Sequence, residues 1–138
     1  MSHTQALHRN SNAVYRLVYH LVLVTKYRRK VLTGPMLDRA AAILASLCKA
    51  WGGQLLECSG EVDHVNALLD VPPKVRPSDI TNNIKTVLSR RLRSEFPSLR
   101  AAYRGKPVLW SPSYCIISAG GAPIEILRQY VENQKRPE

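Results

Sequence analysis

The chain has 138 residues, of which 45% are hydrophobic and 22% are charged. This length suits one domain with a single core, and the composition argues against disorder, collagen-like repetition and a disulfide-rich scaffold. Twenty lysines and arginines stand against ten acidic residues and give a net charge of +10, with a sequence pI near 10.0. That balance favours a polyanionic partner, either nucleic acid or an anionic membrane surface.

The amino-terminal segment is polar, and we expect a flexible leader over residues 1–12 of a single domain that spans 1–138. The segment lacks the apolar core of a signal peptide, and no run of eighteen apolar residues follows that would cross a membrane. Cys48, Cys58 and Cys115 share no CxxC spacing, so we expect reduced structural thiols. The sequence therefore predicts a cytoplasmic protein.

Residues 14–24 combine β-branched and aromatic side chains, with apolar residues at both parities, which is typical of a central strand covered on both faces. Thr33 and Pro35 then mark the start of a helix. Apolar residues follow at spacings of three and four, which predicts an amphipathic helix that Gly52 and Gly53 end.

Two strands, 54–59 and 62–71, are predicted next, joined by a tight turn near Gly60. Alternation in the second strand gives it an apolar face, formed by Val65, Ala67, Leu69 and Val71. His64 and Asn66 then share the opposite face, where an imidazole nitrogen and an amide oxygen lie close enough to bind one small cation. An ordinary hydrogen-bonded strand histidine beside an ordinary asparagine is the alternative, because a single His-x-Asn motif is weak.

A second helix is predicted to start at a cap formed by Ser78 or Asp79 and to end before Pro97. Residues 98–107 are predicted as a loop, and residues 108–118 as a strand broken at a proline. The order of elements is then β, α, β, β, α, β, followed by one more helix. This order predicts an α+β, ferredoxin-like (RRM-like) fold, in which an antiparallel sheet has its helices on one face.

The last predicted helix runs from about 123 to 134, after a hinge at Gly120 and Gly121. Tyr130 and Gln134 are one helical turn apart on its surface. A phenol becomes a nucleophile when a bound cation stabilises the phenolate. A tyrosine at the edge of the core and a solvated glutamine fit the same spacing.

Basic residues gather in two clusters, at 26–30 and 85–106, with aromatic residues nearby. Such clusters suit phosphate contacts and base stacking, so we expect them to bind nucleic acid. A membrane-surface role is disfavoured, because no helix combines a strong apolar face with a uniformly cationic one. The expected contacts are Lys26, Arg28, Arg29, Lys30, Lys85, Arg90, Arg91, Arg93, Arg104 and Lys106.

Four segments, in order along nearly the whole chain, resemble the small single-tyrosine transposases of the HUH endonuclease superfamily, of the IS-two-hundred and IS-six-hundred-and-five insertion-sequence type. They are YHLVLVTKYRRKVL (19–32), GEVDHVNALLDVPPK (60–74), LWSPSYCIISAGG (109–121) and ILRQYVENQ (126–134). The resemblance implies the ferredoxin-like fold, a homodimer, and cleavage and rejoining of single-stranded DNA that carries hairpins at the element ends. It also implies a requirement for Mg²⁺ or Mn²⁺.

By the same resemblance, Tyr130 is the catalytic residue that forms a 5′-phosphotyrosine link, and His64 and Gln134 are metal ligands. In several members the tyrosine helix docks on the partner subunit, and Gly120 and Gly121 would be the flexible connection. The chain departs from the family at Asn66, where the family usually has a second histidine. Asn66 is then the remaining expected ligand, since hard cations accept an amide oxygen. The alternative is a catalytically impaired derivative that binds structured single-stranded nucleic acid.

Overall fold

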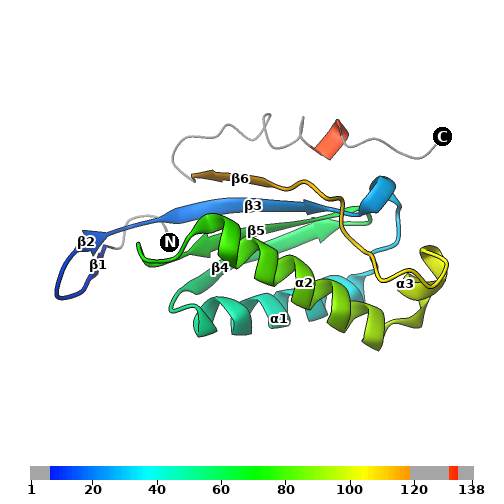
Figure 1. Ribbon diagram of the computed structural model, residues 1–138, viewed down its shortest axis with the longest axis horizontal. Coiled ribbons are helices and arrows are strands. Elements are labelled where there is room, and N and C mark those ends of the chain that lie inside the picture. Colours follow the sequence, from blue (N-terminus) through cyan, green and yellow to red (C-terminus); the bar gives the residue numbers. More distant parts are fainter. Residues whose placement is uncertain (1–6, 119–130, 134–138) are drawn as a thin grey trace.

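The fold is built on a four-stranded antiparallel sheet (Figure 1). The structure is a computed structural model, and it describes residues 7–118 and 131–133. Its strands are β3 (Val18–Val24), β4 (Gln54–Glu61), β5 (His64–Asp70) and β6 (Cys115–Ser118), in the spatial order β4-β5-β3-β6. Each neighbouring pair is antiparallel. With the helices between the strands, this is the ferredoxin-like arrangement, and the fold predicted from the sequence is confirmed.

Two long helices, α1 (Gly34–Ala50) and α2 (Pro77–Glu95), cover one face of this sheet (Figure 1). The predicted start of α1 is confirmed, because the Thr33 side chain caps it by accepting a hydrogen bond from the Met36 amide at 3.4 Å. Its predicted end is also confirmed: Gly52 follows the helix at φ 84°, a conformation that favours glycine.

The core lies between the helices and the inner face of the sheet. The inner sheet face contributes, among others, Leu21, Leu23, Val65, Ala67 and Leu69, and the helices contribute Ile43, Leu44, Ile84 and Leu88. A second, smaller apolar cluster lies apart from this core and joins Val22 and Val24 of β3 to Val131. Because Val22 and Val24 alternate with Leu21 and Leu23, this cluster lies on the open face of the sheet, which is the face that α1 and α2 do not cover.

The start of α2 differs from the prediction. The helix begins at Pro77, and its N-cap is Arg76, which makes no side-chain capping bond. Caps at Ser78 and Asp79 are therefore wrong. Proline is favoured at the first helical position because it lacks the amide hydrogen that would be left unpaired there. Asp79 lies instead in the first turn, where its negative charge interacts favourably with the positive end of the helix dipole.

A short helix, α3 (Pro97–Ala102), occupies part of the region 98–107 that was predicted as a loop. That prediction is wrong for this part. Pro97 stops α2 but is itself well suited to open a new helix, and the following turn contains two alanines.

The turn between β4 and β5 lies at residues 62–63, after Glu61, so its predicted position near Gly60 is wrong. Gly60 stays in β4, opposite Val65. A side chain there would lie 2.6 Å from the His64 carbonyl oxygen and 2.8 Å from Leu37 Cδ2, so this glycine serves close packing.

The predicted strand 14–24 is divided into β2 (Val14–Tyr15) and β3. β2 pairs with β1 (His8–Arg9) in a separate hairpin, and His8 Nε2 lies 2.6 Å from Asp70 Oδ2. The strand β1 lies inside 1–12, so part of the segment expected to be a flexible leader is instead paired.

The predicted strand 108–118 is shorter than expected, because β6 begins only at Cys115 and Trp110 makes an isolated bridge to Thr25. Gly120, Gly121 and most of the predicted last helix lie outside the described residues.

Cys48, Cys58 and Cys115 are free thiols, and burial raises the pKa of Cys48 and of Cys58 to about 11. Within 7–118 and 131–133, no helix is long and apolar enough to cross a membrane.

Candidate functional site

The predicted alternation in β5 is confirmed. Val65 and Ala67 belong to the main core, while His64 and Asn66 lie opposite Val24 and Val22 of β3. Residues paired across two antiparallel strands point to the same face. His64 and Asn66 therefore share the open face of the sheet with the cluster that contains Val131.

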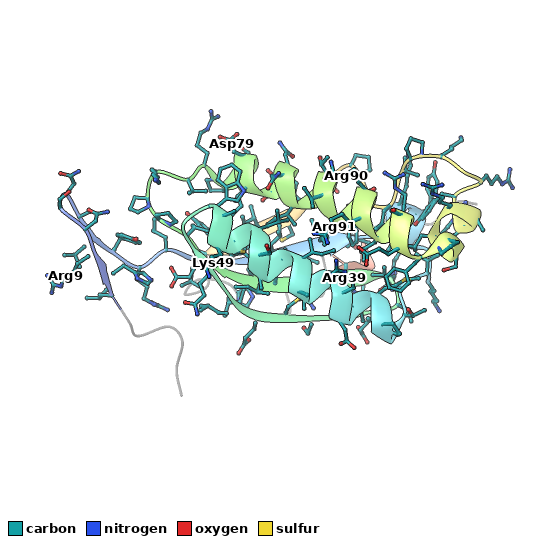
Figure 2. The ribbon with its side chains drawn as sticks, turned by 90° about the horizontal axis from the view of Figure 1, so that it is seen from below. Arg9, Arg39, Lys49, Asp79, Arg90 and Arg91 are labelled. Carbon is teal, nitrogen blue, oxygen red and sulfur yellow. The ribbon has the colours of Figure 1, made fainter. Side chains whose placement is uncertain are left out.

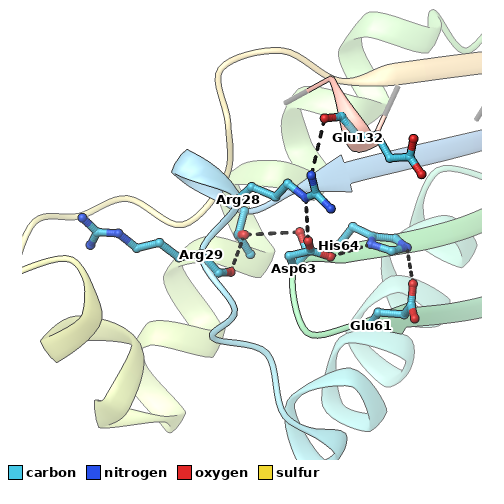
Figure 3. Close-up of polar contacts among 7 residues, drawn as sticks. Arg28, Arg29, Glu61, Asp63, His64 and Glu132 are labelled. Carbon is cyan, nitrogen blue, oxygen red and sulfur yellow. Dashed lines mark hydrogen bonds and ion pairs between the residues drawn. The ribbon is translucent and has the colours of Figure 1, made fainter. Parts of the chain in front are cut away.

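Hydrogen bonding fixes the orientation of the His64 ring. Its Nδ1 lies 2.8 Å from Asp63 Oδ1 (Figure 3). Burial alone would raise the pKa of Asp63, but hydrogen bonds from His64 and Arg28 outweigh it and hold this pKa below its ordinary value. An ionised carboxylate only accepts, so Nδ1 carries the proton and Nε2 is the atom left to bind a cation.

Arg28 connects this histidine to the carboxyl-terminal segment. Its Nε donates to Asp63 Oδ2 at 2.9 Å, and its Nη1 donates to the Glu132 carbonyl oxygen at 3.4 Å (Figure 3). Val131 packs on Val22 and Val24 beside the same contacts. The residue that precedes Val131 in the sequence is Tyr130, so the chain passes the His64 side of the sheet directly after the expected nucleophile.

The loop that carries Arg28 holds two neighbouring residues in left-handed backbone conformations, Tyr27 at φ 62° and Arg28 at φ 55°. Each such residue costs about 1–3 kcal/mol unless its surroundings hold it. The Thr25 hydroxyl contacts the carbonyl oxygens of Arg29 at 2.7 Å and Asp63 at 3.2 Å, and the Tyr103 hydroxyl donates to the Lys26 carbonyl at 2.9 Å. These bonds tie the loop to the turn that carries Asp63.

The first basic cluster is therefore partly engaged within the chain. The Arg29 guanidinium lies over the rings of Tyr27 at 5.3 Å and Tyr103 at 4.9 Å, and it donates to the Ala102 carbonyl. Lys26 Nζ lies 5.4 Å from the centre of the Tyr27 ring, and Lys30 is exposed.

The second basic cluster is spread over α2 and the segment after α3. Lys85 Nζ donates to the carbonyl oxygens of Ser111 at 3.0 Å and Pro112 at 2.9 Å, and burial lowers its pKa. Arg93 donates to Ser89, and Arg91 Nε lies 3.8 Å from Glu95 Oε2. Arg90, Arg104 and Lys106 are exposed. Figure 2 shows Arg90 and Arg91 on α2, in the helical layer.

Tyr130 and Gln134 lie outside the described residues, so the structure brings together only His64 and Asn66 of the four residues expected at the centre. Among residues 7–118 and 131–133, no three histidine, cysteine, aspartate or glutamate side chains gather as a metal site would require. The sequence reasoning missed Glu61 and Asp63. Asp63 adjoins His64 in the sequence, and Glu61 lies opposite it across the turn.

A family model described as "Transposase IS200 like" matches residues 13–134. The ISDra2 transposase TnpA of Deinococcus radiodurans is 32% identical over 121 residues, which cover 88% of this chain and 86% of that protein. The transposase for insertion sequence element IS200 of Salmonella typhimurium is 30% identical over 116 residues, covering 84% and 75%.

Two solved structures share the fold. A crystal structure of a Deinococcus radiodurans protein superposes with a TM-score of 0.86 at 32% identity, covering 94% of this chain and 99% of that one. The structure of a REP-associated tyrosine transposase bound to a REP hairpin gives a TM-score of 0.51 at 13% identity, covering 91% and 70%. At that identity the second likeness concerns the fold alone.

Proposed function

Because this chain belongs to the IS200-like transposase family, we propose that it cleaves and rejoins single-stranded DNA at insertion-sequence ends through a 5′-phosphotyrosine intermediate. The observation that carries the proposal is the orientation of His64. Its Nδ1 is held by Asp63, so Nε2 is the ring nitrogen available to a cation on the sheet face where Val131 packs. The working unit proposed from the family resemblance is a homodimer.

The residues present fit a hard divalent cation. His64 offers a ring nitrogen, and Asn66 and Gln134 offer amide oxygens, the donor types that Mg²⁺ and Mn²⁺ accept. We propose these three side chains as ligands. When bound, the cation would neutralise negative charge that develops on the scissile phosphate.

Tyr130 is the proposed nucleophile. Its phenolic oxygen gives up its proton and forms a bond to phosphorus while the bond from phosphorus to the 3′ oxygen breaks, and the departing oxygen takes up a proton as a free 3′-hydroxyl. The phosphotyrosine retains the bond energy, so a 3′-hydroxyl can reverse the step and join strands without a nucleotide cofactor. The substrate must be unpaired, because a regular duplex does not let a side chain reach and rearrange a phosphate without melting.

We propose that the two basic clusters bind hairpin-bearing strands. Their exposed members, Lys30, Arg90, Arg104 and Lys106, are available for the first phosphate contacts. The expected result is a strong salt dependence: with about six phosphate contacts, affinity for a single strand falls roughly several-hundred-fold between 50 and 200 mM salt. Fluorescence anisotropy across a salt series measures it. A flat response, or equal affinity for a blunt duplex of the same length, would contradict the proposal.

Substitutions at Asn66 test the metal site. Asn66→Ala should slow metal-dependent cleavage about tenfold or more while leaving DNA affinity nearly unchanged, because it removes an oxygen donor and no positive charge. Asn66→His should raise cleavage with Mn²⁺ more than with Mg²⁺, since imidazole suits the softer ion better. Cleavage of labelled strands in each metal is the measurement. If Asn66→Ala cleaves as well as the parent, Asn66 is not a ligand.

The second candidate function is binding of structured single-stranded nucleic acid without cleavage. Asn66 favours it, because a neutral amide is a weaker ligand than the histidine usual in the family. The same cleavage experiment separates the two: hairpin binding without cleavage of any strand in either metal would support the impaired derivative.

A further inference from the structure

Glu61 faces the metal-binding edge of His64. It is the last residue of β4 and lies directly opposite His64 in the strand register, so both side chains are on the open face of the sheet. Glu61 Oε2 lies 3.6 Å from His64 Nε2, and the Glu61 side chain is 76% exposed (Figure 3). The carboxylate is thus available to bind a cation together with the His64 ring.

This contact is too long for a hydrogen bond. Nδ1 of the ring lies against Asp63, so Nε2 is the ring nitrogen that faces the Glu61 carboxylate. A ring nitrogen and a carboxylate oxygen are both donor types that a divalent cation accepts. Two ligands of one cation, with bonds of about 2.1 Å, lie roughly 3.0–3.4 Å apart, close to the separation here.

We propose that Glu61 is a direct ligand of the catalytic cation, in addition to His64, Asn66 and Gln134; this inference rests on the proposed function. Its carboxylate supplies an anionic oxygen at a site where Asn66 provides only a neutral one. A hard cation is bound more tightly as the number of anionic ligands rises. Glu61 therefore compensates for the missing second histidine of the family.

The experiment measures Mn²⁺ binding to the full chain without DNA, from the electron paramagnetic resonance signal of free Mn²⁺. Glu61→Gln should raise the dissociation constant for Mn²⁺ about 10- to 100-fold. Removing a group that supports a metal site weakens metal binding by a factor of this size. The matched control is Glu57→Gln, which removes the same charge from an exposed position of the same strand. It should change the dissociation constant less than about twofold, because a distant surface charge acts only through screened electrostatics.

A double substitution tests the compensation directly. In an Asn66→His background, Glu61→Gln should weaken Mn²⁺ binding less than in the parent, because the second imidazole supplies the missing donor. Unchanged affinity in Glu61→Gln, or an equal loss in Glu57→Gln, would overturn the assignment of Glu61 while leaving the site at His64 intact. If the parent itself binds no Mn²⁺, with or without DNA, both this inference and the proposed metal-dependent function fail.

Discussion

Replacing Tyr130 by phenylalanine is expected to abolish the covalent protein–DNA adduct and strand cleavage, while the affinity for hairpin-bearing single strands stays at the parent value. The substitution removes only the phenolic oxygen, which is the atom proposed to bond to phosphorus. The measurement is incubation with a labelled single strand and Mn²⁺, followed by a denaturing gel that retains covalent complexes.

The matched control is Tyr15→Phe, which makes the same change in the hairpin β1–β2, where the Tyr15 ring stacks on His8 with centroids 5.1 Å apart. This variant should form the adduct as the parent does. An adduct of undiminished yield in Tyr130→Phe would show that another side chain attacks the DNA.

Gly53→Ala is expected to be the most destabilising small substitution in the described fold. A Cβ atom at this position would lie 2.2 Å from the Asp70 carbonyl oxygen and 3.2 Å from Val71 Cα. Both obstacles are backbone at the end of a central strand, so the sheet must shift, and we expect a loss of about 3 kcal/mol in the free energy of unfolding. Thermal denaturation should show a fall in melting temperature of roughly 10 °C.

Gly34→Ala provides the control, because no atom lies within 4 Å of a Cβ built there and the residue opens α1. Its stability should stay within about 0.5 kcal/mol of the parent. Equal stability of Gly53→Ala and Gly34→Ala would show that the sheet accommodates the added methyl group.

Much of the architecture is predictable from local sequence, because periodicity and caps act over short distances. The Thr33 cap, the glycines after α1 and the alternation in β5 were enough to predict α1 and the common face of His64 and Asn66. The errors occur where two local signals compete. Gly60 is typical of a turn, yet close packing against Leu37 keeps it in β4, and Pro97, which ends one helix, also begins another.

The parts of the site that could not be predicted depend on contacts between distant segments. Charge and clustering suggested that Arg28 and Arg29 bind phosphate, but the structure shows Arg28 paired with Asp63 and Arg29 stacked on Tyr103. Glu61 is close to His64 only because the turn at 62–63 sets the strand register. A shift of that turn by one residue would have placed Glu61 on the other face.

The most direct test of the central claim is mass spectrometric mapping of the adduct after digestion with trypsin. Cleavage after Arg128 and Lys135 gives a peptide of residues 129–135, in which Tyr130 is the only tyrosine. We predict that the nucleotide is attached to this peptide through a 5′-phosphate on Tyr130. Attachment to any other peptide, or cleaved DNA with no protein attached, would contradict the proposed phosphotyrosine mechanism.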